Sequence, residues 1–342
     1  MINRLPGMLL GVALGLSALF MVSCAAESKP AADAPAPAAA SEALSPAITT
    51  PAVAVPAETA PAGPAAPIET AAAKKANLKL LAWNVQLLPT TLSRFAKSLQ
   101  KQQELRAPWI VEYLNAQDYD VVVLQEVIDK RATEKIKEGL KASYPYIIAP
   151  VPEKGVAGAS GGNLIASRIP MKYVAHIVFE NVAGVDRIAT KGCVIAEGEK
   201  DGVIFQIVGT HLQAGHQEEK DKQYVEMGDK VIKPHRRDAV PQILAGDFNT
   251  DEGTDKFEML LGATGMRAYP MTDPRPFTID PENSWSRPGK RLGRPDHIFL
   301  NPCGTGSTII GQTVQRARRE HEGKIMDLSD HYGLIAEIVL MK

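Results

Sequence analysis

The sequence predicts a mixed α/β fold that is rich in β-sheet. Short apolar runs of β type recur along residues 77–342, and each borders a turn or a polar residue. Helical patterns fill only some of the intervals between these runs. Many strands with few helices between them favour a sandwich of two sheets with helices outside. This part of the chain is also long enough to form one large domain with its own core.

Seven segments are predicted as strands because each is a short apolar run beside a turn or a polar residue. They are residues 78–83, 121–124, 163–166, 203–209, 243–245, 298–300 and 334–340. Three segments show the periodicity of helices that bury one face. They are residues 107–116, 132–140 and 220–232.

Residues 1–24 predict an export signal. Arg4 gives a positive start, and the apolar run 8–22 is shorter than the roughly 20 residues that span a bilayer. The small residue before Cys24 resembles a bacterial lipobox, in which Cys24 would become the lipidated N-terminus. An ordinary signal peptide that is cut elsewhere and an uncleaved anchor are the alternatives. Ala25 and Ala26 then imply a lipid anchor in the outer membrane of the bacterial cell envelope, facing the periplasm or the surface.

Residues 25–76 are dominated by Ala and Pro and carry almost no large apolar side chains. Such a segment cannot bury enough surface to offset the entropy lost on ordering. Its prolines favour an extended conformation. We therefore expect a disordered tether, followed by one folded domain over residues 77–342.

Charge and cysteine content restrict the function only weakly. The formal net charge is −1, which gives no general argument for nucleic acid. Two basic clusters have the ordinary interpretation of solvated faces. They are Arg287, Lys290, Arg291 and Arg294, and Arg316, Arg318 and Arg319. Cys193 and Cys303 either pair or remain as buried thiols, and the apolar strand pattern around Cys193 favours thiols.

Eight polar residues lie at the ends of the predicted strands, where the backbone leaves the core. They are Asn84, Glu126, His211, Asp247, Asn249, Asp296, Asp330 and His331. Each one alone has an ordinary interpretation as a cap or a turn residue. Together they contain only carboxylates, carboxamides and imidazoles, which are ligands of divalent cations and groups of acid–base catalysis.

Six motifs occur in an order that resembles the endonuclease/exonuclease/phosphatase superfamily. They are Trp83-Asn84-Val85, Leu124-Gln125-Glu126, Gly209-Thr210-His211-Leu212, Ala245-Gly246-Asp247-Phe248-Asn249, Arg294-Pro295-Asp296-His297-Ile298-Phe299 and Ser329-Asp330-His331-Tyr332. The resemblance covers about residues 78–340, and the superfamily includes DNase I-like nucleases, inositol polyphosphate phosphatases and neutral sphingomyelinases. It implies a four-layered α/β sandwich, in which two facing mixed β-sheets are flanked by helices and carry the site at one end.

The resemblance also implies a metal site. Glu126 would be a direct ligand of Mg²⁺, with Asn84 on the same ion or on the phosphate. Asp330 would be a further carboxylate on the metal side. Mn²⁺ is expected to substitute for Mg²⁺. The implied activity is that of a metal-dependent phosphoric diester hydrolase, in which water attacks the phosphodiester.

The remaining residues are assigned catalytic roles by the same resemblance. Asp247 would hold or orient the attacking water, and Asn249 would donate to a phosphate oxygen. His331 would be the general base or a phosphate-binding imidazole, with its tautomer fixed by Asp296. His211 would donate to the phosphate or protonate the leaving oxygen.

The chain departs from the family pattern beside Asp296, where Pro295 and His297 replace a hydrophobic residue and a tyrosine. His297 is either an extra phosphate ligand or a substitute for the tyrosine within the strand. We favour the second interpretation.

Several features favour the neutral sphingomyelinase branch. Gln213 and Ala214 extend the His211 motif as in that branch, and the stretch from the strand before Glu126 to Tyr144-Pro145-Tyr146 is also similar. Asp186 and Lys191 resemble a pair whose lysine is thought to position the substrate phosphate. The alternative for this pair is an ordinary surface loop. Phospholipase C-type cleavage of phospholipid head groups is therefore predicted.

The predicted anchor supports this choice, because it would hold a monomeric enzyme beside phospholipids. Tyr269, Phe277 and Trp285 would either touch the membrane or pack locally. The alternative function is an extracellular DNase I-like nuclease, in which the basic segment 287–294 grips the backbone of a nucleic acid. A non-catalytic binding lipoprotein would show an incomplete site, whereas the set of site residues here is complete.

Overall fold

The computed structural model describes residues 74–89, 96–151, 161–187, 189–286, 289 and 291–342. The predicted export signal, Cys24 and nearly all of the predicted tether lie outside these ranges. The first strand begins at Lys75, two residues before the predicted boundary, because Lys75 and Ala76 pair with Met341 and Leu340. No helix within the described ranges is long and apolar enough to cross a membrane.

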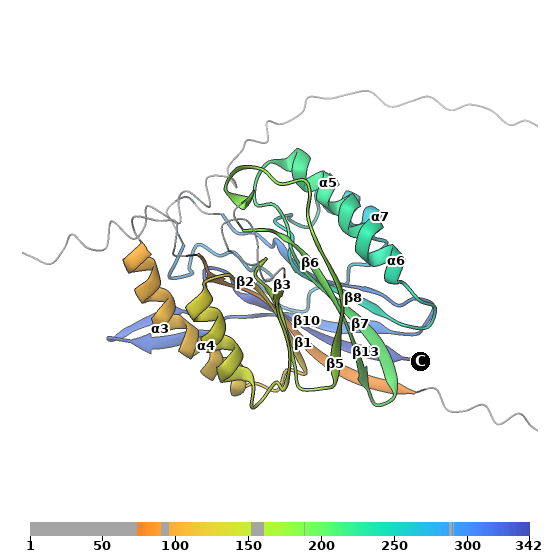
Figure 1. The fold of residues 1–342 in the computed structure, drawn as a ribbon, viewed down its shortest axis with the longest axis horizontal. Coiled ribbons are helices and arrows are strands. Elements are labelled where there is room, and N and C mark those ends of the chain that lie inside the picture. The colour runs from red at the N-terminus through yellow and green to blue at the C-terminus, as the bar shows by residue number, and fades with distance from the viewer. Residues whose placement is uncertain (1–73, 90–95, 152–160, 188, 287–288, 290) are drawn as a thin grey trace, which may run out of the picture. The chain divides into compact units, whose positions relative to one another are not determined.

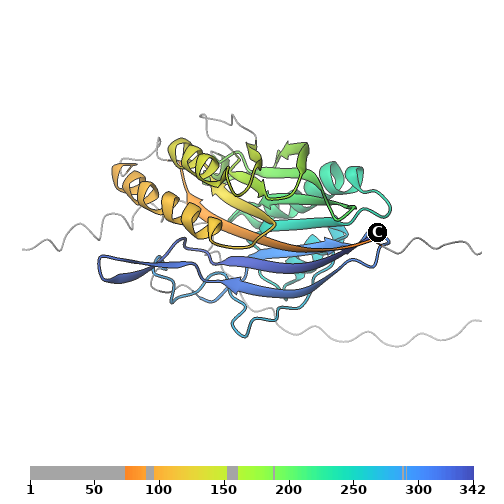
Figure 2. The same ribbon diagram turned by 90° about the horizontal axis from the view of Figure 1, so that it is seen from below.

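Two mixed sheets form the centre of the domain. In spatial order, the first contains β10 (Thr308–Gln315), β13 (Gly333–Met341), β1 (Lys75–Leu87), β2 (Val121–Val127), β4 (Asn163–Ser167) and β3 (Tyr146–Val151). The second contains β5 (Met171–Val178), β6 (Gly192–Lys200), β7 (Val203–His211), β8 (Gln242–Asp247) and β9 (Asp296–Asn301). A separate antiparallel hairpin, drawn in dark blue in Figure 2, is made by β11 (Arg318–His321) and β12 (Lys324–Asp327).

Helices cover the outer face of each sheet, with one group on each side of the strands in Figure 1. The first group contains α3 (Ala96–Asn115) and α4 (Lys130–Leu140). The second contains α5 (Gln217–Met227), the π-helical turn η4 (Gly228–Ile232), α6 (Lys233–His235) and α7 (Asp255–Thr264). A short 3₁₀ turn, η3 (Gly184–Arg187), precedes β6. The predicted four-layered α/β sandwich is confirmed.

Alternation along the strands sorts the apolar side chains into three cores. On β1, Leu80 and Ala82 belong to the core between the two sheets. Leu81 and Trp83 point the other way and belong to the core beneath α3 and α4. A third core lies beneath the second helix group and includes Phe257 of α7. Burial of these apolar surfaces is the main favourable contribution to folding.

Strand direction brings the polar strand ends to one edge of the domain. β1 is parallel to β2 and β7 is parallel to β8, so each pair ends on the same side. β9 and β13 run antiparallel to their neighbours, so they begin where those neighbours end. The register places His211 opposite Asp247, and Asp247 opposite Asp296. Residues that are far apart in sequence therefore meet at this edge.

Candidate active site

The Asp296–His331 pair lies at the start of two strands, one from each sheet. Nδ1 of His331 donates to Oδ2 of Asp296 over 2.9 Å, and the hydroxyl of Thr278 donates to the same oxygen over 2.5 Å. Burial raises the pKa of Asp296, although the charge of His331 opposes this rise. Burial disfavours the imidazolium of His331, but Asp296 outweighs it and raises the pKa of His331 well above its ordinary value. The predicted contact between these two residues is confirmed.

Asp247 and Asn249 belong to one tight turn at the end of β8. Oδ1 of Asp247 accepts from the backbone N–H of Asn249 over 2.9 Å, and Asn249 has a left-handed φ of 49°. Burial alone would raise the pKa of Asp247, but the nearby His331, His211 and Lys191 outweigh it and lower that pKa. The turn therefore holds a buried carboxylate that stays ionised, with a carboxamide beside it.

Glycine at position 246 allows this turn to lie close to β7. A Cβ atom on Gly246 would lie 2.0 Å from the carbonyl oxygen of Thr210, which is too close for any other residue. Oδ2 of Asp247 then lies 3.5 Å from Nε2 of His211 and 4.0 Å from Nδ1 of His331. The turn places Asp247 between the two imidazoles.

The backbone of Glu126 departs from regular strand geometry. Strict alternation on β2 would point Glu126 towards α3 and α4, together with Val122 and Leu124. Instead Glu126 has a left-handed φ of 58°, and its Oε1 lies 3.8 Å from Nε2 of His211. Gly162 makes this possible, since a Cβ atom there would lie 3.2 Å from the Glu126 Cα. The strained backbone turns the carboxylate into the site.

Asn84 lies near the end of β1, and Asp330 lies on the segment that precedes β13. Nδ2 of Asn84 donates to Oδ2 of Asp247 over 3.1 Å. Oδ2 of Asp330 accepts from Nε2 of Gln86 over 2.7 Å, and the hydroxyl of Ser329 donates to the Asn84 carbonyl over 2.7 Å. These contacts bring the predicted metal-side residues to the same edge as the catalytic residues.

Lys191 is buried beside His211, with only 2% of its surface exposed. Its Nζ donates to Nε2 of His211 over 3.0 Å and to the Leu212 carbonyl over 2.7 Å, and it forms an ion pair with Oδ1 of Asp186 at 3.1 Å. Burial and the charge of Lys191 lower the pKa of His211 to about 3. The surface-loop alternative for Asp186 and Lys191 is therefore wrong. In this structure Nε2 of His211 accepts from Lys191, and the lowered pKa favours the neutral imidazole. The predicted contact of His211 with the phosphate or the leaving oxygen stays a prediction.

Gln213 and Ala214 hold the segment that carries Asp186, the ion-pair partner of Lys191. Its carboxamide accepts from the backbone N–H of Ala183 over 3.1 Å and donates to the Ala183 carbonyl over 3.2 Å. The backbone N–H of Ala214 donates to Oδ2 of Asp186 over 2.8 Å. The Gln213-Ala214 motif therefore fixes the turn that carries Asp186.

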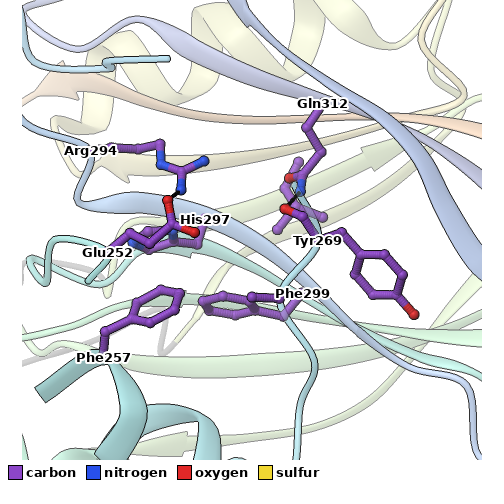
Figure 3. A pocket seen from close by; sticks show the side chains of 9 residues that line it. Glu252, Phe257, Tyr269, Arg294, His297, Phe299 and Gln312 are labelled. Atoms are coloured by element: carbon purple, nitrogen blue, oxygen red, sulfur yellow. Dashed lines mark hydrogen bonds and ion pairs between the residues drawn. The ribbon is translucent and has the colours of Figure 1, made fainter. Parts of the chain in front are cut away.

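His297 lies on the helix side of β9 and not in the site. Its ring stacks on Phe299 with centroids 5.2 Å apart, and its Nε2 donates to the Thr250 carbonyl over 2.8 Å. Burial lowers its pKa to about 3. Figure 3 shows the pocket beside it, where Arg294 pairs with Glu252. Our preferred interpretation of His297 as a residue packed within the strand is supported.

The geometry and charge of the site suit a divalent cation. Burial and the neighbouring carboxylate of Asp330 raise the pKa of Glu126 to about 7. A bound cation favours the ionised form of such a carboxylate, and carboxylate with carboxamide oxygens is the donor set that Mg²⁺ prefers. Glu126, Asp330 and Asn84 therefore fit the predicted ion.

Asp247, Asp296 and His331 also bring ligand atoms within 4.8 Å of one another. However, Nδ1 of His331 already donates a hydrogen bond to Asp296. A cation at that position would have to displace the shared proton. We therefore assign this second group to proton transfer rather than to metal binding.

Other sequence features are used structurally. Every described arginine of the two basic clusters has an acidic partner; the pairs are Arg291–Asp251, Arg294–Glu252, Arg316–Asp273, Arg318–Asp327 and Arg319–Glu112. Arg287 and Lys290 lie outside the described residues. Tyr269 packs against the core between the sheets, and the indole N–H of Trp285 donates to the Asp327 carbonyl over 2.7 Å. Cys193 is a buried thiol as expected, whereas Cys303 is an unpaired thiol that is only half-buried.

Three residues that support the site were not predicted from the sequence. Thr278 donates to Asp296, Gln86 donates to Asp330, and Arg106 donates to backbone carbonyls behind them. Thr278 lies in an irregular segment and Arg106 lies inside a helix, so neither has a recognisable motif. Gln86 directly follows the Trp83-Asn84-Val85 motif. This position next to a predicted site residue was the one sequence signal that could have identified it.

Comparison with known proteins identifies the family. The model of the Endonuclease/Exonuclease/phosphatase family matches residues 81–331. Phospholipase C of Staphylococcus aureus is 29% identical over 252 residues, which cover 67% of this chain and 74% of that protein. Sphingomyelinase C of Leptospira interrogans is 28% identical over 204 residues, 54% of this chain and 36% of that protein.

A solved structure extends the comparison to three dimensions. The crystal structure of a Staphylococcus aureus beta toxin mutant with bound magnesium ions has a TM-score of 0.64 and 26% sequence identity. It covers 77% of this chain and 99% of the toxin chain. These relatives confirm the predicted resemblance to sphingomyelinases. The chain therefore belongs to the Endonuclease/Exonuclease/phosphatase family of phosphoric ester hydrolases.

Proposed function

We propose that this chain is an Mg²⁺-dependent phosphodiesterase that removes head groups from phospholipids in a sphingomyelinase-like, phospholipase C-type reaction. The observation that carries the proposal is the buried Asp186–Lys191 pair beside His211 and Asn249, in a site that also holds Glu126. Similarity to a phospholipase C and a sphingomyelinase C supports the lipid substrate.

Glu126, Asp330 and Asn84 would hold the ion. Bound Mg²⁺, or Mn²⁺ in its place, supplies positive charge beside the phosphate oxygens and the leaving oxygen. Gln86 and Ser329 keep Asp330 and the backbone of Asn84 in place through hydrogen bonds of 2.7 Å each. These contacts reduce the reorganisation that the site would need before it binds a substrate.

Asp247, Asp296 and His331 would activate the water. Because Nδ1 of His331 donates to Asp296, Nε2 is the nitrogen that can exchange a proton with the substrate or the water. The raised pKa of His331 favours its protonated form, which binds phosphate oxygens, whereas a nearby cation would favour the neutral base. Asp247 would orient the water through the carboxylate oxygens beside both imidazoles.

Asn249, His211 and Lys191 would contact the opposite side of the phosphate. The Asn249 carboxamide is a neutral donor, which suits a non-bridging oxygen. Lys191 would stabilise charge either directly or through His211, to which it already donates. A site built in this way favours the transition state because negative charge on the phosphate grows during the reaction.

We also propose that the enzyme is exported, that Cys24 is lipidated, and that residues 25–76 tether a monomeric domain to the cell envelope. The support is the sequence pattern of residues 1–76. Substituting Cys24→Ala should move the protein from the membrane fraction to the soluble fraction of an expressing cell. Unchanged membrane association would contradict lipidation at this residue.

The alternative is a nuclease with the same metal chemistry. It receives less support because Arg294, the described arginine closest to Asp296 in sequence, is paired with Glu252. The full chain should be incubated with Mg²⁺ and either sphingomyelin vesicles or supercoiled plasmid DNA. Released phosphocholine with intact plasmid is expected. Nicked plasmid without phosphocholine release would replace the lipid substrate with nucleic acid.

A further inference from the structure

Arg106 is a buried cation that lies in α3, behind the metal-side residues and outside the catalytic motifs. Only 2% of its surface is exposed. We propose that Arg106 is a positioning residue whose guanidinium holds together the two segments that carry Asn84 and Asp330. This inference rests on the proposed role of those two residues in binding the cation.

The guanidinium joins two segments that are more than 200 residues apart in the sequence. Nη1 donates to the carbonyls of Val85 over 3.1 Å and Leu328 over 2.9 Å. Nη2 donates to the carbonyl of Gln86 over 2.6 Å. Val85 and Gln86 follow Asn84 in the sequence. Leu328 precedes Ser329-Asp330. One side chain therefore fixes the spacing between the two metal-side segments.

The carbonyls at the end of β1 need such a donor. The pairing of β1 with β2 shifts its register between Asn84 and Leu87, and Gln86 has a left-handed φ of 49°. A break in the ladder leaves backbone carbonyls without their usual strand partners. A buried carbonyl without a donor costs about 1–3 kcal/mol. Arg106 supplies the donors and so stabilises the irregular backbone on which Asn84 depends.

The effect passes from the backbone to the ligands through short contacts. The N–H of Gln86 donates to Oδ1 of Asn84 over 3.1 Å, and its Nε2 donates to Oδ2 of Asp330 over 2.7 Å. The position of Gln86 is itself set by the bond between its carbonyl and Arg106. Movement of this carbonyl would therefore disturb both predicted ligands together.

Arginine suits this position better than lysine. Its planar group offers several donors in fixed directions, whereas an ammonium on a flexible stem has no such fixed arrangement. The Trp285 ring lies against the guanidinium, 5.3 Å from centroid to Cζ. Trp285 also donates to the carbonyl of Asp327, next to Leu328. Trp285 therefore fixes the orientation of the Arg106 guanidinium from a third segment of the chain.

Arg168 provides a matched control at the opposite end of β2. It donates to the carbonyls of Tyr119 over 2.8 Å and Gln117 over 2.7 Å, and its guanidinium lies 4.5 Å from the centroid of the Tyr144 ring. It therefore makes the same kinds of contact as Arg106, namely backbone carbonyls and an aromatic face. Its surroundings contain none of the proposed metal ligands.

The test measures the Kd for Mn²⁺. The full chain is titrated with Mn²⁺ without substrate, and binding is monitored by electron paramagnetic resonance. We compare wild type, Arg106→Lys and Arg168→Lys, and check each fold by the thermal unfolding midpoint. Loss of an outer-shell partner of a metal ligand typically weakens metal binding about 10–100-fold. We expect that range for Arg106→Lys and an unchanged Kd for Arg168→Lys. An unchanged Kd for folded Arg106→Lys, or equal weakening in both variants, would overturn the inference.

A second variant covers the case in which Arg106→Lys does not fold. Gln86→Met keeps the volume but removes the donor to Asp330, so it should also weaken Mn²⁺ binding by about tenfold or more. Wild-type affinity in Gln86→Met would overturn the inferred path from Arg106 to Asp330. If wild type itself does not bind Mn²⁺, the proposed metal-dependent function fails, and that outcome is distinct from failure of the positioning role alone.

Discussion

Replacing Asp296 with asparagine should separate the charge of this residue from its shape. In the structure one oxygen of Asp296 accepts from both His331 and Thr278. If the asparagine oxygen takes that place, the amide nitrogen takes the position of Oδ1, which has no hydrogen-bond partner among the described residues. If the amide turns over, its N–H groups face the donors of His331 and Thr278. Both orientations leave a buried donor unpaired.

The catalytic cost follows from these contacts. A neutral carboxamide in place of the Asp296 carboxylate cannot stabilise a charged His331, and the reversed amide favours the wrong imidazole tautomer. Changes of this kind in a carboxylate–histidine pair reduce kcat by on the order of 10²–10⁴, or about 2.7–5.5 kcal/mol of transition-state stabilisation. KM should change little, because Asp296 lies behind His331 and does not face the substrate in the proposed reaction.

The assay is phosphocholine release from sphingomyelin vesicles with saturating Mg²⁺, together with the thermal unfolding midpoint. Thr278→Val is the matched control, since it removes the other hydrogen bond to the same oxygen and leaves the charge in place. Its kcat should stay within about tenfold of wild type. A folded Asp296→Asn variant that loses no more activity than Thr278→Val would refute the assigned role of the carboxylate.

Three further predictions concern other parts of the site. Asp247→Ala should lower kcat by about 10³ or more without unfolding the domain; steady-state kinetics showing a loss below tenfold would remove Asp247 from the catalytic set. Lys191→Ala should impair sphingomyelin cleavage more than cleavage of bis(p-nitrophenyl) phosphate, and equal losses would contradict a role in gripping the lipid phosphate. Gly162→Ala should reduce both stability, by about 1–3 kcal/mol in denaturant unfolding, and activity. Its control is Gly253→Ala, because Gly253 also has a left-handed φ but a Cβ atom added there would meet no atom within 4 Å. Equal activity in the two variants would argue against the role of Gly162 beside Glu126.

Much of the architecture could be predicted because strongly apolar strands carry a clear signal. The seven predicted strands correspond to β1, β2, β4, β7, β8, β9 and β13, and all have mostly buried side chains. The edge strand β5 was missed because its burial pattern mixes exposed and half-buried positions along its length. The hairpin strands β11 and β12 were missed for the same reason, since their short segments are largely polar. Pattern reading detects burial, which β5, β11 and β12 lack. β3, β6 and β10 were not predicted as strands either, although most of β6 is buried.

The residues of the site were identified from the sequence, whereas their orientations were not. Regular alternation would have turned Glu126 away from the site, and only its left-handed backbone brings it towards His211. Similarly, the sequence suggested Lys191 as a phosphate ligand but did not predict that this side chain is buried between Asp186 and His211. That burial depends on a turn fixed by Gln213. Such tertiary contacts leave no periodic signal in the sequence.

In the proposed function, a divalent cation bound near Glu126 is required for cleavage of a phospholipid diester. The most direct measurement is the rate of phosphocholine release from sphingomyelin vesicles by the full chain in EDTA, and again after addition of excess Mg²⁺. Activity should be lost in EDTA and restored by Mg²⁺ in wild type. A Glu126→Gln variant should remain inactive at the Mg²⁺ concentration that restores wild type. Full activity in EDTA, or a Glu126→Gln variant as active as wild type, would contradict the claim.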